Sequence, residues 1–290
     1  MSALTRKMTL NDLRSARATG QKVPMLTCYD FTTAGLMQEA GVPALLVGDS
    51  AANVILGYGS TLPVPLSFMI EITAAVRRGA PLAFLAADMP FGSYQGSLGS
   101  AVLNVCKVVK RTGCDCVKLE VAGGHAGLIR SLADAGVAVM AHLGLRPQSV
   151  GLLGGYKFQG RTADEAQSII STARVMQSAG AAALLLEAVP PEVGEAVVAA
   201  VGIPVIGCGA GPACDGSVIV THDALGLTSR PPRFVPKLGD LASPSVRLFA
   251  DYVRLVQEGH YPATEHNYQM SEGEKLKLAT VDDLAEGNPF

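Results

Sequence analysis

The feature that most constrains this fold is the regular alternation of short apolar runs with amphipathic segments. Each run is continuously apolar, which is typical of strands buried on both faces of a parallel sheet. The runs that we expect to form strands are Val23–Cys28, Ala44–Gly48, Leu82–Ala87, Cys116–Glu120, Ala138–His142, Ala183–Glu187 and Pro204–Gly207. The helices expected between them are Thr32–Ala40, Leu66–Arg78, Ser100–Arg111, His125–Ala135, Thr162–Ala179 and Pro191–Val201. This order predicts βα units, and an eighth unit would close an α/β (βα)8 TIM barrel.

The eighth unit is ambiguous in the sequence. Val218–Val220 has the composition of a strand, but a parallel crossover needs about a dozen residues or more. Only Cys208–Gly216 separates this run from the preceding strand. The closing elements that we therefore expect are an Asp215 N-cap, a helix over Val218–Leu225 that stops at Gly226, a strand at Arg233–Lys237 and a helix at Ser245–Glu258.

The chain is expected to form one barrel domain over residues 1–266, followed by a polar, loosely held tail at 267–290. Thr9–Ala18 is expected to form an extra helix before the first strand. The glycine-rich insertion Gly144–Gly160 is long for a compact domain, and we expect it to be a lid or a subunit contact. Gly207–Gly211 lies where many barrels bind phosphate, although it could equally be a tight turn.

Charge and hydropathy exclude several classes of function. Lys and Arg total 23 against 25 Asp and Glu, so the chain lacks the basic excess of a nucleic-acid or anionic-membrane binder. No apolar stretch reaches the roughly 18 residues that suggest a membrane span, and Met1–Gly20 has no apolar core of a secretory signal. The six cysteines form no CxxC pair, which is typical of reduced thiols in a cytoplasmic protein.

Ionisable residues stand at the carboxyl ends of the predicted strands. Asp49, Asp88, Glu120, His142 and Glu187 each end an apolar run or follow it directly. In a (βα)8 barrel these ends meet on one face, where active sites lie. Buried carboxylates are costly unless they are paired or bound to a metal. Their convergence therefore predicts a cation site, a proton-transfer site, or both.

Three of these carboxylates are candidate metal ligands. Asp49, Asp88 and Glu120 come from neighbouring strands, and hard oxygen donors suit Mg²⁺. The alternative is that each carboxylate caps the helix after its strand. Zinc is disfavoured because no Cys/His pair stands at ligand spacing.

Two further residues could hold an acidic substrate. Lys118 faces the same side of its strand as Glu120. It could bind a substrate carboxylate, form a Schiff base, or simply form a buried ion pair. Ser50 offers a hydroxyl and a backbone N–H to an anion.

Glu187 stands apart from the metal candidates and is the candidate base. A carboxylate away from the metal keeps a higher pKa and can take a proton from a carbon acid. Its alternative role is to cap the helix that begins near Pro190–Pro191. His142 could polarise a carbonyl group, hold a tautomer in a hydrogen-bond network, or be a structural histidine.

A collinear series of motifs between Thr27 and His266 resembles the ketopantoate hydroxymethyltransferase family. The matching segments are TCYDFTTA, LLVGDS, STLPV, AAVRRGAP, ADMPFGSY, VKLE, HLGLRPQSV, GGYKFQGR, LLLEAVP, IPVIGCGAG, DGSVIVTHDALG and EGHYPATEH. The chain departs from the family pattern at several places. Val121-Ala122 is inserted before Gly123-Gly124, Gly57–Leu62 lacks an expected His-Asp pair, and further differences lie at Glu71-Ile72, Ala141–Leu143 and Cys208.

The resemblance implies a barrel of the phosphoenolpyruvate mutase/isocitrate lyase type. It implies transfer of a hydroxymethyl group from 5,10-methylenetetrahydrofolate to 3-methyl-2-oxobutanoate, giving 2-dehydropantoate for pantothenate synthesis through an enolate stabilised by Mg²⁺. The site roles carried over are metal binding for Asp49, Asp88 and Glu120, substrate binding for Lys118 and Ser50, and proton removal for Glu187. The family also implies a homo-oligomer, commonly a decamer.

Two other functions remain open at this point. One is a lyase or mutase of the same barrel superfamily that acts on another 2-oxo acid or on a phosphonate. The other is a non-catalytic paralogue that keeps a 2-oxo acid site, because one barrel fold hosts many functions.

Overall fold

A computed structural model describes residues 4–285 of the chain, which separate into two compact units with the boundary in the sequence between Gly239 and Asp240. The first unit contains a closed barrel of eight parallel strands in chain order, with β1 paired to β8. Its strands are β1 Val23–Thr27, β2 Ala44–Val47, β3 Phe84–Asp88, β4 Cys116–Glu120, β5 Val139–Gly144, β6 Ala183–Glu187, β7 Val205–Cys208 and β8 Gly216–Ile219. The predicted (βα)8 fold class is confirmed.

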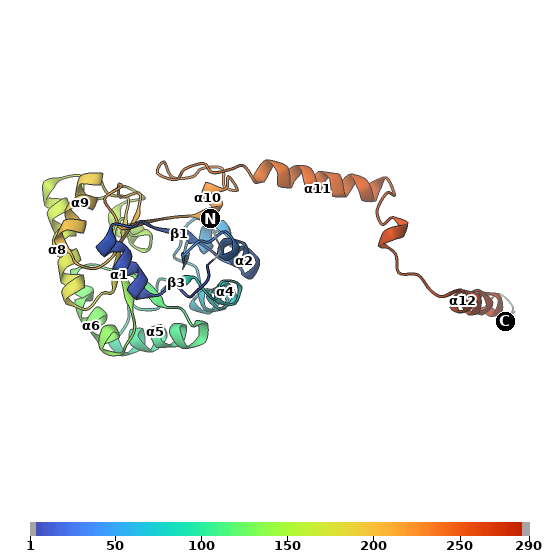
Figure 1. The fold of residues 1–290 in the computed structure, drawn as a ribbon, viewed down its shortest axis with the longest axis horizontal. Coiled ribbons are helices and arrows are strands. Elements are labelled where there is room, and N and C mark those ends of the chain that lie inside the picture. Colours follow the sequence, from blue (N-terminus) through green and yellow to red (C-terminus); the bar gives the residue numbers. More distant parts are fainter. Residues whose placement is uncertain (1–3, 286–290) are drawn as a thin grey trace. The chain divides into compact units, whose positions relative to one another are not determined.

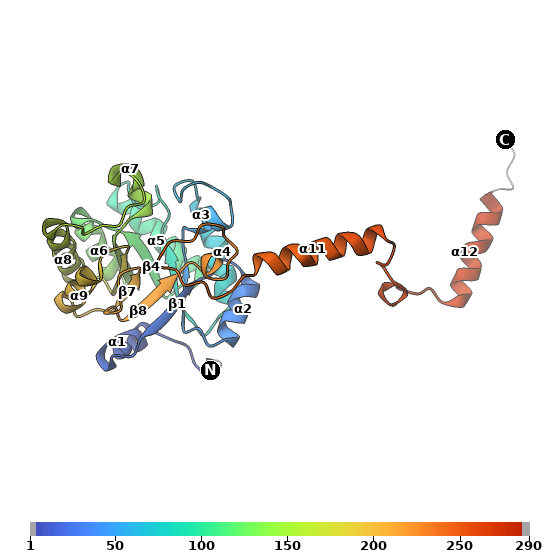
Figure 2. The ribbon, with the colours of Figure 1, turned by 90° about the horizontal axis from the view of Figure 1, so that it is seen from above.

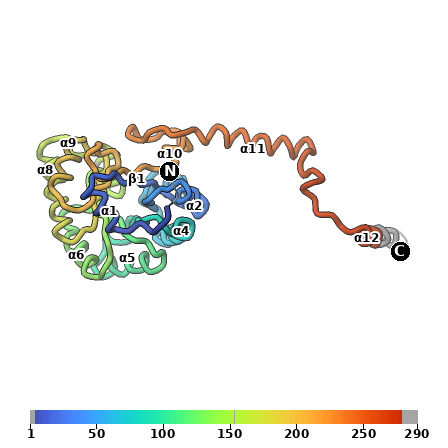
Figure 3. Tube along the Cα trace, in the orientation of Figure 1, coloured from blue at the N-terminus to red at the C-terminus, as the bar shows by residue number. Residues whose placement is uncertain are grey.

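Helices of the first unit surround the strands (Figure 1). They are α1 Leu10–Thr19, α2 Phe31–Glu39, α3 Ala51–Val54, α4 Leu66–Gly79, α5 Leu98–Thr112, η1 Gly123–His125, α6 Ala126–Asp134, η2 Pro147–Ser149, α7 Val150–Leu153, α8 Ala163–Ser178, α9 Pro191–Ala200 and α10 Thr221–Ala224. The chain winds around the barrel in sequence order, as the colours of Figure 3 show. No helix of the described residues is long and apolar enough to cross a membrane.

The strand residues divide into two cores because successive side chains point to opposite faces. On β3, Phe84 and Ala86 belong to the core inside the barrel, whereas Leu85 and Ala87 pack in the layer beneath the helices. Asp88 follows the inward parity and faces the cavity at the carboxyl end of the strands. Side-chain alternation thus places the acidic strand ends inside the barrel rather than among the helices.

The extra N-terminal helix is confirmed as α1, and its fully buried Leu13 belongs to the inner core. Figure 2 shows α1 at one end of the barrel, with α3 and α7 at the opposite end. Arg17 of α1 forms an ion pair of 2.6 Å with Asp215. The helix α1 therefore packs across the amino end of the barrel.

The predicted closure of the barrel was wrong. Asp215 does not cap a helix over Val218–Leu225; it immediately precedes β8, which pairs with β1 and β7. The described segment Arg233–Lys237 forms no strand. A crossover helix is unnecessary because β7 and β8 are short, so residues 209–215 can return directly. Gly209 and Gly211 make this turn with φ of +69° and +85°.

The second unit contains α11 Ala242–Gln257, η3 Thr264–His266 and α12 Glu272–Ala285. The helix α11 spans nearly all of the helix expected at Ser245–Glu258, which therefore belongs to the second unit and not to the barrel. The compact barrel unit ends at Gly239, so the expected domain limit at residue 266 falls inside the second unit. The segment expected to be a loose tail contains α12, which the structure describes as far as Ala285.

Candidate active site

All seven predicted site residues line one cavity of about 650 Å³ at the carboxyl end of the barrel. They are Asp49, Ser50, Asp88, Lys118, Glu120, His142 and Glu187. Strand pairing sets them side by side, since Asp88 is level with Lys118 and Glu120 with His142. Neighbouring strands therefore bring together residues far apart in the sequence.

Lys118 is the buried cation of the site. Its Nζ lies 2.9 Å from Oδ1 of Asp88. Burial by itself would lower the pKa of Lys118, but the carboxylates of Asp88, Asp49 and Glu120 raise it above its ordinary value. The side chain stays protonated, which suits ion pairing and substrate binding rather than Schiff-base formation.

Asp49 and Asp88 are joined through the backbone at the end of β2. The Asp49 N–H donates to Oδ2 of Asp88 at 2.9 Å. Burial raises the pKa of Asp88, and the nearby charge of Asp49 adds to this effect while Lys118 opposes it. A further positive charge would relieve the cost of keeping both carboxylates ionised here.

Gln148 is a site residue that the sequence analysis missed. It lies in the insertion after β5, and its backbone N–H donates to both oxygens of Glu120, at 3.2 and 3.0 Å. Its side-chain Nε2 donates to Oδ2 of Asp49 at 2.8 Å, and its Oε1 accepts from the Tyr94 hydroxyl at 2.9 Å. Gln148 thus fixes two of the predicted ligands at once. The one available signal was its position in a long insertion next to a strand end.

Glu187 lies beside His142 rather than among the paired carboxylates. Its Oε2 is 3.3 Å from His142 Nε2. Burial raises the pKa of Glu187 to about 7, with Lys118 opposing. The pKa of His142 is lowered by burial first and by Lys118 next, so the imidazole is neutral. A carboxylate with a pKa near 7 is suited to general-base catalysis at neutral pH.

The alternative capping roles do not hold for the helices after β2 and β6. Ser50 is the N-cap residue of α3 and its side chain makes no capping hydrogen bond. The Asp49 carboxylate does not cap this helix either, and accepts a hydrogen bond from the Gln148 side chain. The helix α9 begins after Pro190 without a side-chain cap, and Glu187 faces the cavity. Ser50 itself lies in the cavity, with its Oγ 2.8 Å from the Tyr29 hydroxyl.

A three-carboxylate metal cluster is not formed by the described residues, among which no three His, Cys, Asp or Glu side chains group closely enough to hold a metal ion. Asp49 and Asp88 are the linked pair, and Glu120 is held by Gln148 on the adjoining strand. Mg²⁺ is commonly bound by one or two carboxylates, with waters and substrate completing its shell. Two buried carboxylates with a raised pKa at Asp88 fit that requirement.

Comparison with known proteins identifies close relatives. A family model described as "Ketopantoate hydroxymethyltransferase" matches residues 7–264. A 3-methyl-2-oxobutanoate hydroxymethyltransferase of Desulfotalea psychrophila is 43% identical over 278 residues, which are 95% of this chain and 99% of that protein. One from Geobacillus kaustophilus is 44% identical over 268 residues, covering 92% of this chain and 96% of the relative.

Solved structures show the same fold at low sequence identity. A phosphoenolpyruvate phosphomutase from Streptomyces platensis subsp. rosaceus matches with a TM-score of 0.60 at 13% identity, covering 96% of this chain and 97% of its own. A 2,3-dimethylmalate lyase matches with a TM-score of 0.57 at 16% identity, covering 96% of each chain. These structures therefore share the barrel fold of this chain.

Proposed function

Since the chain belongs to the ketopantoate hydroxymethyltransferase family, we propose that its cavity holds Mg²⁺ and a 2-oxo acid at the Asp49 end and that Glu187 removes a proton from the acid. The activity is transfer of a hydroxymethyl group to 3-methyl-2-oxobutanoate. Family identity implies 5,10-methylenetetrahydrofolate as the donor. The metal, the residue roles and the path of the proton are our proposals.

Asp49 and Asp88 are the proposed metal ligands, with Glu120 as the third carboxylate beside them. Bound there, Mg²⁺ would act as a Lewis acid toward the keto oxygen and so acidify the hydrogen on carbon 3 of the acid. Gln148 keeps Asp49 and Glu120 oriented through its amide groups. The buried cation Lys118, together with the Ser50 hydroxyl, would bind the substrate carboxylate.

Glu187 would accept the carbon 3 proton on a carboxylate oxygen. The C–H bond breaks, and its electron pair forms the new bond from carbon 3 to the methylene carbon of the donor. Both bonds from that methylene carbon to the donor nitrogens break, and one water molecule supplies the hydroxyl oxygen of the product. The proton taken from carbon 3 and the proton released by the water pass to the two nitrogens, so the donor leaves as tetrahydrofolate. His142, neutral and 3.3 Å from Glu187, would steady the base without competing for the proton.

The single observation that carries this proposal is the separation of roles within one cavity. Asp88 is paired with Lys118 and with the Asp49 backbone, whereas Glu187 lies apart from that pair, with Oε2 3.3 Å from the neutral His142. Pairs of carboxylates with different surroundings are a common mark of divided acid–base roles. The superfamily lyase or mutase alternative has no comparable support, because those structures share only the fold.

The test follows hydrogen exchange at carbon 3 of 3-methyl-2-oxobutanoate by NMR in D₂O with Mg²⁺, and then product formation after the donor is added. Exchange without donor and product only with donor are expected for the native chain. Asp88→Ala should lose the Mg²⁺-dependent exchange, whereas Glu187→Gln should bind Mg²⁺ yet lose exchange. Rapid exchange by Glu187→Gln would overturn the base assignment.

The homo-oligomeric assembly, the cytoplasmic location and the lid or contact role of Gly144–Gly160 stay predictions. Leu145, Pro147, Tyr156 and Phe158 from this insertion line the cavity, which supports a role in covering bound substrate.

A further inference from the structure

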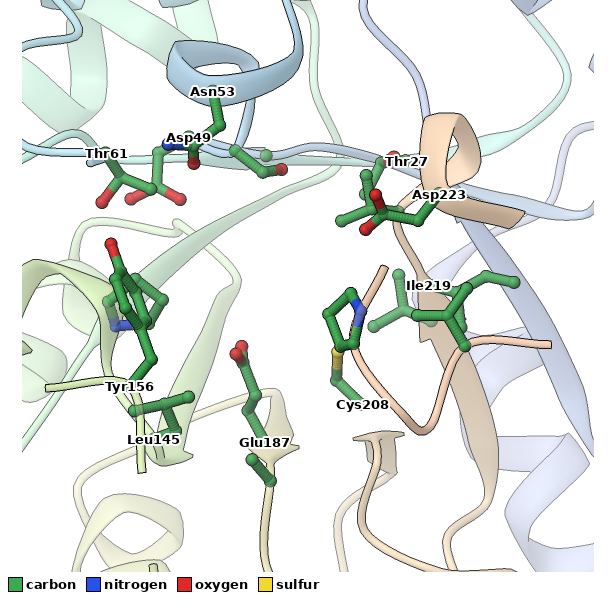
Figure 4. Close-up of a pocket in the computed structure, with 18 of the residues that line it drawn as sticks. Thr27, Asp49, Asn53, Thr61, Leu145, Tyr156, Glu187, Cys208, Ile219 and Asp223 are labelled. Carbon is green, nitrogen blue, oxygen red and sulfur yellow. The ribbon is translucent and has the colours of Figure 1, made fainter. Parts of the chain in front are cut away.

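The cavity has a second end, which takes no part in the binding and deprotonation proposed for the 2-oxo acid. Figure 4 shows Thr27, Ile219 and Asp223 on the side of the opening opposite Asp49 and Thr61, with Glu187 below and between the two sides. The remaining wall at this second end is largely apolar, and its residues include Val218, Val220, Phe234 and Val235. A flat organic ligand with one polar edge would fit such a wall better than a small acid would.

Asp223 is the one carboxylate of this second end, and the fold holds it firmly. It lies on α10, whose first residue Thr221 donates its hydroxyl to the Thr27 carbonyl at 2.6 Å. The Thr221 N–H donates in turn to the Thr27 hydroxyl at 3.0 Å. The Thr228 hydroxyl donates to Oδ1 of Asp223, and it is the only hydrogen-bond partner of that carboxylate within residues 4–285. The carboxylate of Asp223 can therefore still accept hydrogen bonds from a ligand, most directly on Oδ2.

Two arginines stand at the outer rim of the same end. Arg230 and Arg233 line the cavity, and both are exposed. Neither forms an ion pair within the part of the chain that the structure describes. Exposed guanidinium groups of this kind bind carboxylates in paired geometry.

A reduced folate has the matching chemistry at each of these points. Its pterin ring carries an N–H and an amino group on one edge, which a carboxylate can accept together. The ring faces are apolar and suit aliphatic and aromatic walls. Its glutamate tail is a chain of carboxylates, which would extend from the ring toward the rim.

We propose that Asp223 binds the N–H and amino edge of the pterin of the one-carbon donor, with the Ile219–Phe234 wall against the ring and Arg230 and Arg233 on the glutamate tail. This inference rests on the proposed function, because it assigns the donor to the cavity end left free by the acid. The donor then approaches the acid from the side opposite Asp49 and above Glu187.

Phe234 depends on a glycine for its place in this wall. A Cβ at Gly209 would lie 2.6 Å from two atoms of the Phe234 ring. Real Cβ atoms do not approach that closely, and Gly209 also has φ of +69°. Close passage of segment 233–235 over the end of β7 therefore requires this glycine.

The test measures tetrahydrofolate binding by calorimetry and donor KM by product NMR. Asp223→Asn replaces an acceptor oxygen with an amide that repels the pterin donors, so we expect the Kd and the donor KM to rise at least tenfold. The KM for 3-methyl-2-oxobutanoate should change less than twofold. Thr228→Val, which frees the carboxylate without removing it, should raise the donor KM by a smaller factor. Asp134→Asn, on exposed α6 surface, is the matched control and should change neither KM.

The rim is tested with donors of different tail length. Arg230→Gln/Arg233→Gln should lose most of any preference for polyglutamate over monoglutamate donor, while the monoglutamate KM changes little. An unchanged donor KM in Asp223→Asn, in a wild type that makes product, would overturn this inference alone. A wild type that exchanges carbon 3 hydrogen but neither binds tetrahydrofolate nor makes product would overturn the folate assignment itself. Equal losses of donor and acid binding in Asp223→Asn would place the residue at the acid end.

Discussion

The Nζ atom of Lys118 lies 3.3 Å from Nδ1 of His142, and this contact fixes the tautomer of the imidazole. A protonated lysine can only donate, so Nδ1 must accept and the ring proton must be on Nε2. That nitrogen is the one 3.3 Å from Glu187. The cation that pairs with Asp88 therefore also places the ring proton on the nitrogen nearer the proposed base, although Nε2 makes no hydrogen bond to Glu187 in this structure.

His142 should act as a positioning residue for Glu187. Replacing it in His142→Gln removes the oriented N–H, and we expect the rate of carbon 3 exchange to fall by about tenfold or more, within the range of general-base effects. Loss of that N–H also makes the ionised form of the Glu187 carboxylate less stable and so raises its pKa. The acidic limb of the pH profile of exchange should therefore move to higher pH. Exchange measured between pH 5 and pH 9 tests both effects. A lower exchange rate in His142→Gln, with the acidic limb of the pH profile unchanged, would mean that His142 has only a structural role.

The pH dependence of the native chain follows from the pKa of Glu187, which burial raises to about 7. Only the ionised carboxylate can accept a proton. Exchange should therefore be constant above the pKa and should fall about tenfold for each pH unit below it. Initial rates of deuterium incorporation into the acid measure this limb directly. A rate that stays level down to pH 5 would exclude Glu187 as the base.

Lys118 should also matter for stability, because it is a buried cation among carboxylates. Lys118→Met leaves Asp88 without its partner, and removing one member of a buried pair costs about 3–5 kcal/mol. Urea unfolding without divalent cations measures this loss. Lys107→Met, exposed on α5, is the matched control and should lie within about 0.5 kcal/mol of the native chain. Equal stability of the two variants would show that the pair contributes nothing.

The part of the site formed by strand residues was predictable from the sequence. Asp88, Lys118, Glu120 and Glu187 lie on β-strands of fixed side-chain period, so their inward direction follows from parity alone. Barrel closure then brings strand ends together whatever the loops do. Asp49 lies two residues after β2 and has the parity of Leu45 and Val47, which face the helices, so its place in the cavity depends on the turn after the strand.

The part formed by loops was not predictable. Gln148 reaches Asp49 and Glu120 from an insertion whose path depends on tertiary contacts. The short return from β7 to β8 depends on the positive φ of Gly209 and Gly211, which allows a turn that rules for crossover length exclude. Asp223 faces the cavity only because Val218 and Ile219 form a strand instead of a helix.

Asp215 gives a direct test of the corrected closure. Its Oδ2 accepts from Arg17 at 2.6 Å and from the backbone N–H of Val205 at 2.8 Å. The carboxylate thus ties α1 and β7 to the start of β8. Asp215→Ala leaves a buried N–H and a half-buried guanidinium without this acceptor, which should lower the free energy of unfolding by about 3 kcal/mol.

Asp215→Asn keeps one acceptor oxygen and should lose about half as much stability. A residue acting only as an exposed helix N-cap would give a different result, because asparagine caps helices as well as aspartate does and the substitution would be almost neutral. Chemical denaturation of both variants beside Asp134→Ala, an exposed control, separates the two arrangements. A neutral Asp215→Asn would favour the helix-capping role that the sequence alone had predicted.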